Sequence, residues 1–127
     1  LRGRFILEDK LSYDDVLLKP QKTDVTSLSN VETSVSLCGI DLSVPILSAP
    51  MDTVTERDMA EALADEGGMG VVHRFLGADE QPSMVEGVSP VAGAVGLDEF
   101  DRCRKLVDTG ANILVADIAH GHHQSFL

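Results

Sequence analysis

Short apolar runs alternate with longer amphipathic stretches over residues 44–127. The runs cover residues 44–49, 69–73, 91–95 and 111–116, and their near-continuous apolar character is typical of strands buried on both faces of a sheet. Counted from Ile46 to Met69, Ala92 and Ile113, they recur at intervals of 23, 23 and 21 residues. This spacing predicts a repeating β/α unit and therefore a parallel sheet.

The first predicted helix follows the run at 44–49. Thr55 is its expected N-cap, Asp58 occupies the capping-box position three residues later, and Gly67 with Gly68 ends the helix. Its apolar stripe consists of Met59, Ala60, Leu63 and Ala64.

Two further helices are predicted between the later strands. Asp79 is the expected N-cap of a short helix that tolerates Pro82 in its first turn. Asp98 is the expected N-cap of a longer helix that ends at Gly110. The core face of this longer helix is predicted to be Phe100, Cys103 and Val107.

Residues 1–43 do not fit the repeat and are assigned to a separate N-terminal part. Residues 12–20 resemble a leader, in which Asp14 and Asp15 suit a turn or capping role, and residues 33–42 resemble a short β-hairpin. We expect this part to flank one mouth of the β/α region at 44–127.

Two architectures use a repeated β/α unit: an open doubly wound sheet and a closed eightfold barrel. No GxGxxG lies between a strand and a helix, since the glycines at 67–70 come before a strand. The sequence therefore favours the α/β class and the N-terminal portion of a (β/α)8 TIM barrel, with about four parallel strands. Four strands leave two open edges and one uncovered apolar face, so we expect an isolated piece to be insoluble, domain-swapped or loosely packed.

Composition and charge narrow the function classes. The 127 residues are 43% apolar and carry a formal net charge of −11, which disfavours nucleic acid as a partner. The apolar runs are far shorter than the roughly 18 to 20 residues of a spanning helix, and no signal-peptide pattern follows Leu1. We expect no membrane association and a cytoplasmic location.

Cys38 and Cys103 stand apart without a metal or disulfide pattern, and both are predicted to be buried thiols.

Candidate chemistry follows the carboxyl ends of the predicted strands, where β/α barrels carry their active sites. Asp117 follows the fourth strand, and its carboxylate could accept hydrogen bonds from a sugar diol or could cap a helix. A zinc site of a metal-dependent hydrolase is an alternative for the His-rich turn, with Asp117 or His73 completing the ligands. The histidines of that turn are His120, His122 and His123.

Four motifs in order resemble the inosine monophosphate (IMP) dehydrogenase and guanosine monophosphate (GMP) reductase family. They are YDDVLL at 13–18, SAPMDTVTE at 48–56, GGMGVVHR at 67–74 and DIAHGH at 117–122. The resemblance extends from about residue 11 to the end of the chain. It implies the eightfold barrel, oxidation of IMP to xanthosine monophosphate with NAD, and a homotetramer in the full-length enzyme.

The resemblance also implies site residues. Met51 matches the position that packs on the purine, and His73 either lines the substrate cavity or supports it from behind. Asp117 matches the residue that holds the nicotinamide ribose, and Ala119 lies near the nicotinamide. Ile118 stands where the family often has Thr or Ser, so a hydroxyl contact to the cofactor is not expected there.

The resemblance places the family's catalytic cysteine and potassium site on later strands, beyond Leu127. We therefore expect this chain to be an N-terminal piece without a catalytic residue or a metal site. Thr55 stands where a reductase would have Gly, which favours the dehydrogenase. Only residues 75–90 follow His73 before the next strand, so the regulatory CBS modules of most dehydrogenases, which reductases lack, are missing. The GMP reductase therefore stays an alternative, as does a non-catalytic half-barrel that binds or assembles with a partner.

Overall fold

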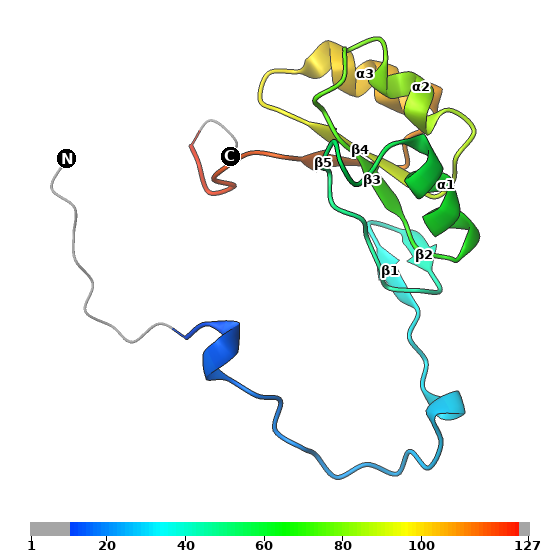
Figure 1. The fold of residues 1–127 in the computed structure, drawn as a ribbon, viewed down its shortest axis with the longest axis vertical. Coiled ribbons are helices and arrows are strands. Elements are labelled where there is room, and N and C mark those ends of the chain that lie inside the picture. Colours follow the sequence, from blue (N-terminus) through cyan, green and yellow to red (C-terminus); the bar gives the residue numbers. More distant parts are fainter. Residues whose placement is uncertain (1–10, 125–127) are drawn as a thin grey trace, which may run out of the picture. The chain divides into compact units, whose positions relative to one another are not determined.

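A computed structural model describes residues 11–124, which form two separate compact units (Figure 1). In the first unit, which extends to Val31, the described residues contain only two single-turn 3-10 helices, Tyr13–Asp15 and Leu28–Asn30. The Asp15 carboxylate accepts hydrogen bonds from the Ser12 amide and hydroxyl, both 2.9 Å away, and so closes a capping box. The capping role predicted for this acidic pair is thus confirmed at Asp15.

Two expectations refer to the ends of the chain, which lie outside the described residues 11–124. One is that no signal-peptide pattern follows Leu1. The other is that the catalytic cysteine and the potassium site of the family come after Leu127. Both stay predictions from the sequence.

The second unit, which begins at Glu32, carries the β/α repeat. A parallel sheet is formed by β3 (Gly70–Val72), β4 (Val91–Val95) and β5 (Ile113–Ala116), in that order. The run at 44–49 pairs with this sheet only through the parallel bridge between Leu47 and Met69, so the predicted first strand is reduced to a single bridge. The α/β class and the parallel order are confirmed, and the described residues contain three parallel strands plus that bridge.

Three helices alternate with these strands along the chain: α1 (Arg57–Asp65) precedes β3, α2 (Gln81–Val85) lies between β3 and β4, and α3 (Phe100–Thr109) lies between β4 and β5. Gly67 and Gly110 end α1 and α3 with φ angles of 85° and 114°, as predicted, because this left-handed region strains any residue with a side chain. The predicted N-caps are wrong by one residue each. The N-caps are Glu56, Glu80 and Glu99, and none of them makes a side-chain capping hydrogen bond.

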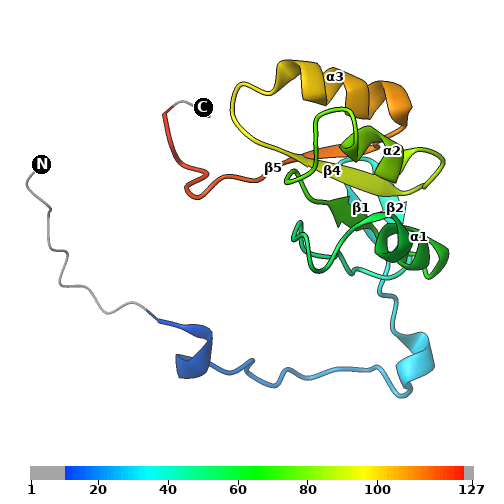
Figure 2. The same cartoon turned by 45° about the horizontal axis from the view of Figure 1, so that its top comes forward.

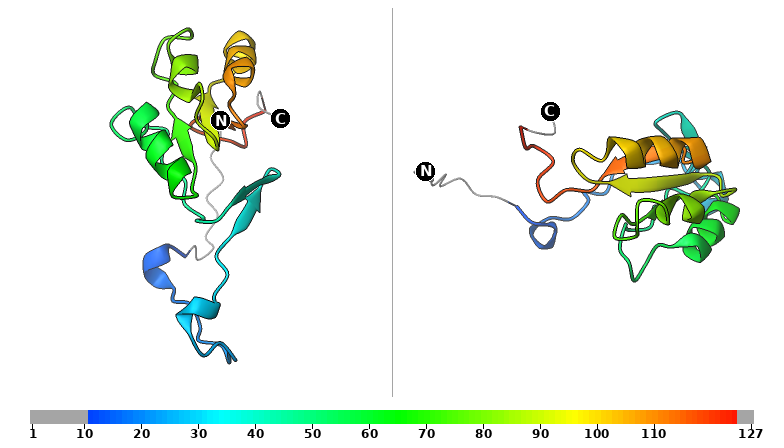
Figure 3. Two further views of the ribbon diagram at one scale, coloured as in Figure 1. Left: turned by 90° about the vertical axis from the view of Figure 1, so that its right-hand side faces the viewer. Right: turned by 90° about the horizontal axis from the view of Figure 1, so that it is seen from above.

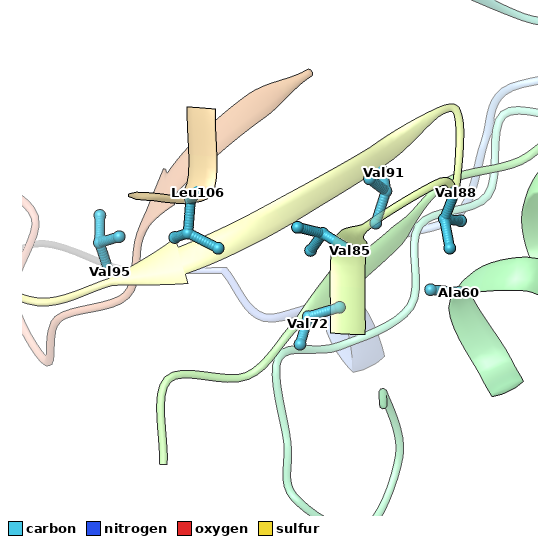
Figure 4. Close-up of a cluster of buried hydrophobic side chains, with 7 residues drawn as sticks. All are labelled: Ala60, Val72, Val85, Val88, Val91, Val95 and Leu106. Atoms are coloured by element: carbon cyan, nitrogen blue, oxygen red, sulfur yellow. The ribbon is translucent and has the colours of Figure 1, made fainter. Parts of the chain in front are cut away.

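The helices pack along one face of the sheet (Figure 3), and a buried cluster joins the two layers (Figure 4). Its members are Ala60, Val72, Val85, Val88, Val91, Val95 and Leu106. On α3 the core contact is Leu106, which is fully buried, while Phe100 and Val107 are 69% and 55% exposed. The predicted core face of α3 is therefore wrong at Phe100 and Val107, and of its three predicted residues only Cys103 packs against this core.

The opposite face of the sheet is covered by the predicted hairpin, which consists of β1 (Val35–Leu37) and β2 (Ile40–Leu42). Leu42 is 2% exposed and lies in a second cluster with Met69, Val71, Ala92 and Ala94. Because side chains alternate along a strand, this set and the helix-facing set come from the same strands. The expectation that one apolar face stays uncovered is wrong, since the hairpin packs on it.

The hairpin turn also shows that the prediction of a buried thiol is wrong for Cys38. Cys38 and Gly39 both have positive φ angles, 51° and 82°, as a two-residue type I′ turn requires. Cys38 is consequently exposed at the tip of the hairpin, whereas Cys103 is partly buried on α3.

Among residues 11–124, no helix has the length and apolar character needed to cross a membrane.

Candidate functional site

The carboxyl ends of the parallel strands define one edge of the sheet, here called the carboxyl edge. The parallel register of β3, β4 and β5, together with the Leu47–Met69 bridge, places four connecting segments there. Figure 2 shows the loop after β4 and the segment after β5 leaving the sheet at the same end. These segments contain Met51, His73, Gly96 and Asp117.

The first segment, residues 48–56, is a tight turn that carries Met51. Val54 and Thr55 both donate backbone hydrogen bonds to the Met51 carbonyl oxygen, at 3.0 and 2.9 Å. The Thr55 side chain is fully buried, and its Oγ1 lies 2.6 Å from the Ala49 carbonyl oxygen. The turn therefore holds the Met51 side chain at its apex, where it is 50% exposed and available to a ligand.

The second segment begins with His73, which is 2% exposed. Its Nδ1 accepts a hydrogen bond from the Phe75 amide at 3.2 Å, so that nitrogen carries no proton. Its Nε2 lies 3.3 Å from Oε1 of Glu56, and a neutral ring with the proton on Nε2 satisfies both contacts. His73 thus links the end of β3 to the start of α1, which is the geometry of a supporting residue.

Arg74 joins the second segment to the fourth. Its Nε donates a hydrogen bond to the Asp117 carbonyl oxygen at 3.1 Å and lies 3.4 Å from the Asp117 carboxylate oxygen Oδ2. Asp117 lies immediately after β5 with one third of its side chain exposed, and no helix follows it within the described residues. The alternative role of Asp117 as a helix N-cap is therefore wrong.

An open, mainly apolar pocket with a volume of about 220 Å³ begins at Ile118, the residue after Asp117. It is lined by Leu97, Ile118, Ala119, His120 and His123. Through Leu97, the pocket brings the loop after β4 next to Ala119, for which the family resemblance implies a place near the nicotinamide. An apolar recess beside an acidic group suits a flat ring attached to a sugar, because the recess covers the ring and the carboxylate accepts from hydroxyl groups.

The His-rich turn does not form the zinc site considered as an alternative. The rings of His120 and His122 lie edge to face, 6.4 Å apart. Within residues 11–124, no group of three or more His, Cys, Asp or Glu side chains is arranged to hold a metal ion. The zinc-hydrolase alternative therefore has no ligand set in the described part of the chain.

The sequence alone did not predict the contacts that Arg74, Thr55 and Glu56 make at the carboxyl edge. Arg74 lies inside the motif at 67–74, but nothing in the sequence pairs it with Asp117, 43 residues later. Thr55 was expected to cap α1, yet its hydroxyl closes the preceding turn. Only the fold brings these groups together.

Comparison with known proteins agrees with this geometry. The family model for the IMP dehydrogenase / GMP reductase domain matches residues 10–127. Inosine-5'-monophosphate dehydrogenase of Bifidobacterium longum is 53% identical over 77 residues, which are 60% of this chain and 14% of the relative. The enzyme of the same name from Staphylococcus epidermidis is 48% identical over 94 residues, or 73% of this chain and 19% of the relative.

A third relative, inosine-5'-monophosphate dehydrogenase of Nitrosopumilus maritimus, is 46% identical over 79 residues, or 61% of this chain and 17% of the relative. The matched segments thus span less than a fifth of the length of these relatives. The parallel β/α order, the conformation of the carboxyl edge and the match over residues 10–127 lead to one conclusion: this chain belongs to the IMP dehydrogenase / GMP reductase family.

Proposed function

We propose that this chain forms the first β/α units of an eightfold barrel in an NAD-dependent IMP dehydrogenase. The observation that carries the proposal is the position of Asp117 at the carboxyl edge, where Arg74 contacts it and an apolar pocket begins at the next residue, Ile118. The parallel order of β3, β4 and β5, with helices on one face, supports the barrel.

The residues present fit a dinucleotide. In this proposal the Asp117 carboxylate accepts hydrogen bonds from the hydroxyl groups of the nicotinamide ribose, and the pocket that includes Ala119 covers the ring. NAD supplies the hydride acceptor of the reaction when it is bound. The residues of this chain contribute by binding and orienting the cofactor, because they control its position and the electrostatics at the carboxyl edge.

The purine would be held by the first segment. Met51 is half exposed at the apex of its turn, and its flexible thioether side chain suits packing against the flat face of a purine. His73 supports that segment through Glu56 from a buried position. Of the two roles considered for His73, its burial favours the supporting role over direct contact with the nucleotide.

The thiol that attacks the purine is proposed to come from a part of the protein beyond Leu127. Cys38 lies at the tip of the β1–β2 hairpin, and Cys103 lies on α3 against the core between helices and sheet. Neither cysteine belongs to a segment at the carboxyl edge. The same proposal for the whole protein includes a bound potassium ion, closure of the barrel, and assembly into a homotetramer in the cytoplasm.

The dehydrogenase is favoured over the GMP reductase by Thr55. Its buried hydroxyl closes the turn that carries Met51, and a Gly at this position could not make that hydrogen bond. The three relatives compared above are also named as IMP dehydrogenases.

The test is to express the complete gene that encodes this chain and to assay both reactions. We expect IMP to be oxidised to xanthosine monophosphate while NAD is reduced, and no oxidation of NADPH with GMP. Asp117→Asn should raise the KM for NAD about tenfold, since a neutral amide oxygen accepts more weakly than a carboxylate. Asp108→Asn, at an exposed position of α3, is the matched control and should leave that KM unchanged. NADPH oxidation with GMP alone would identify the reductase instead.

A further inference from the structure

Arg74 contacts Asp117 although their strands are not neighbours. Arg74 comes shortly after β3, Asp117 comes directly after β5, and β4 lies between these two strands. The Arg74 side chain therefore crosses the carboxyl end of β4 to place its Nε 3.1 Å from the Asp117 carbonyl oxygen. The same Nε lies 3.4 Å from Oδ2, so one group restrains both the backbone and the side chain of Asp117.

Gly96 leaves the space for this crossing. It is the first residue after β4, and a Cβ atom built there would lie 3.2 Å from Nη1 of Arg74 and 3.1 Å from Oε2 of Glu99. The φ angle of Gly96 lies outside the left-handed region, so the backbone conformation does not demand glycine. A side chain at this position would compete with the guanidinium for its path across β4.

Phe75 also contacts the guanidinium. The Cζ atom of Arg74 lies 5.4 Å from the centre of the Phe75 ring, within the range of a cation–π contact. The Phe75 ring in turn stacks on the buried ring of His73, with centroids 5.9 Å apart. These contacts connect His73, which supports the first segment, to the Asp117 carboxylate of the fourth segment.

We propose that Arg74 is the positioning residue for Asp117, and that it holds the carboxylate through Oδ2 while Oδ1 accepts from the ribose of the dinucleotide. The cofactor part of this inference rests on the proposed function of Asp117. Within residues 11–124, Oδ1 makes no hydrogen bond, so it is available for that contact. A lysine cannot replace this arrangement fully, because an ammonium group lacks the planar fork and the Nε position of arginine.

The geometric part can be tested on the full chain without any ligand. The measurement is the carboxyl carbon-13 resonance of Asp117, recorded by NMR for the wild type and four variants. Arg74→Ala should shift this resonance, Arg74→Lys should shift it less, and Gly96→Val should shift it with Arg74 itself intact. Arg104→Ala is the matched control, because Arg104 pairs with the exposed Asp101 on α3. Low concentrations of guanidinium should restore the resonance in Arg74→Ala and not in Gly96→Val, where the valine fills the path. An Asp117 resonance that is the same in all variants would overturn the positioning role.

Titration with NAD then separates this role from the proposed function. We expect Arg74→Ala to weaken NAD binding about tenfold and Arg104→Ala to leave it unchanged. If Asp117→Asn weakens NAD binding while Arg74→Ala does not, the positioning role is contradicted and the cofactor role of Asp117 stands. If Asp117→Asn has no effect, or the wild type binds no NAD, the cofactor role fails and the resonance alone decides whether Arg74 positions Asp117. Should Arg74→Ala fail to fold, Gly96→Val provides the same comparison.

Discussion

The side-chain oxygen of Thr55 lies 2.6 Å from the carbonyl oxygen of Ala49 and 2.7 Å from the hydroxyl of Ser48. A carbonyl oxygen only accepts, so Thr55 donates its proton to Ala49. One buried hydroxyl thereby ties the end of the turn to its beginning and fixes the segment that presents Met51.

Thr55→Val keeps the shape of the side chain and removes this hydrogen bond. We expect the free energy of unfolding to fall by about 1 to 2 kcal/mol, since the Thr55 hydroxyl is buried and its partner loses a donor. Urea unfolding measures the change. Thr53→Val, on an exposed position of the same turn, should change stability by less than about 0.5 kcal/mol. Equal effects of the two variants would show that the Thr55 hydroxyl does not stabilise the turn.

A close approach between α1 and β3 depends on Gly70. A Cβ atom built on Gly70 would lie 2.6 Å from Cα and 2.7 Å from Cβ of Ala60. Gly70→Ala should therefore force the helix away from the sheet and cost about 1 to 3 kcal/mol of stability. The control is Gly121→Ala, because no atom lies within 4 Å of a Cβ built on Gly121. A thermal unfolding midpoint that is unchanged in Gly70→Ala would contradict this packing.

Gln81 is a buried polar residue that connects three elements. Its Nε2 donates to the carbonyl oxygens of Val72 on β3 and Ala94 on β4, at 3.2 and 2.8 Å. Its Oε1 accepts from Nη1 of Arg102 on α3, at 2.8 Å. Gln81→Leu leaves the Arg102 group without this partner, and we expect a loss of about 2 to 3 kcal/mol.

A double-mutant cycle checks whether the Gln81–Arg102 contact carries that loss. Adding Arg102→Leu to Gln81→Leu should cost less than the sum of the two single changes, because both single changes remove the same Gln81–Arg102 hydrogen bond. Strict additivity in urea unfolding would rule out the coupling. Gln21→Leu, at an exposed position of the N-terminal unit, controls for a general effect of replacing glutamine.

The ion pair between Asp79 and Lys105 predicts a pH effect. The side-chain hydrogen bond from Lys105, followed by its positive charge, lowers the pKa of the Asp79 carboxyl. Because the folded-state pKa is lowered, the stabilisation is complete above the unfolded-state pKa and is lost as the pH falls through the folded-state pKa. Both groups are solvent-exposed, so the effect on stability should be small.

NMR titration of the Asp79 carboxyl carbon measures this effect directly. The midpoint should lie below that of an ordinary aspartate in the wild type and should return to the ordinary value in Lys105→Ala. Arg104→Ala removes a neighbouring positive charge that pairs with Asp101 and should leave the Asp79 midpoint in place. A midpoint that does not respond to Lys105→Ala contradicts the pairing.

The sequence alone determined the elements whose signals are local. The apolar runs located β3, β4 and β5, the glycines at 67 and 110 ended their helices, and the hairpin was placed at 33–42. Asp117 was identified at the end of a strand because the order of motifs and the strand period agree. These features depend on neighbouring residues, so they can be recognised along one stretch of chain.

Tertiary structure decided which side chains meet. The face of α3 that packs on the sheet, the covering of the other sheet face by the β1–β2 hairpin, and the contact of Arg74 with Asp117 all join residues far apart in sequence. The predicted N-cap at Thr55 failed for a related reason, since Thr55 makes its hydrogen bond with the preceding turn and not with α1. Such contacts depend on how the sheet, helices and loops pack in three dimensions. The spacing of apolar residues along the chain does not predict that packing.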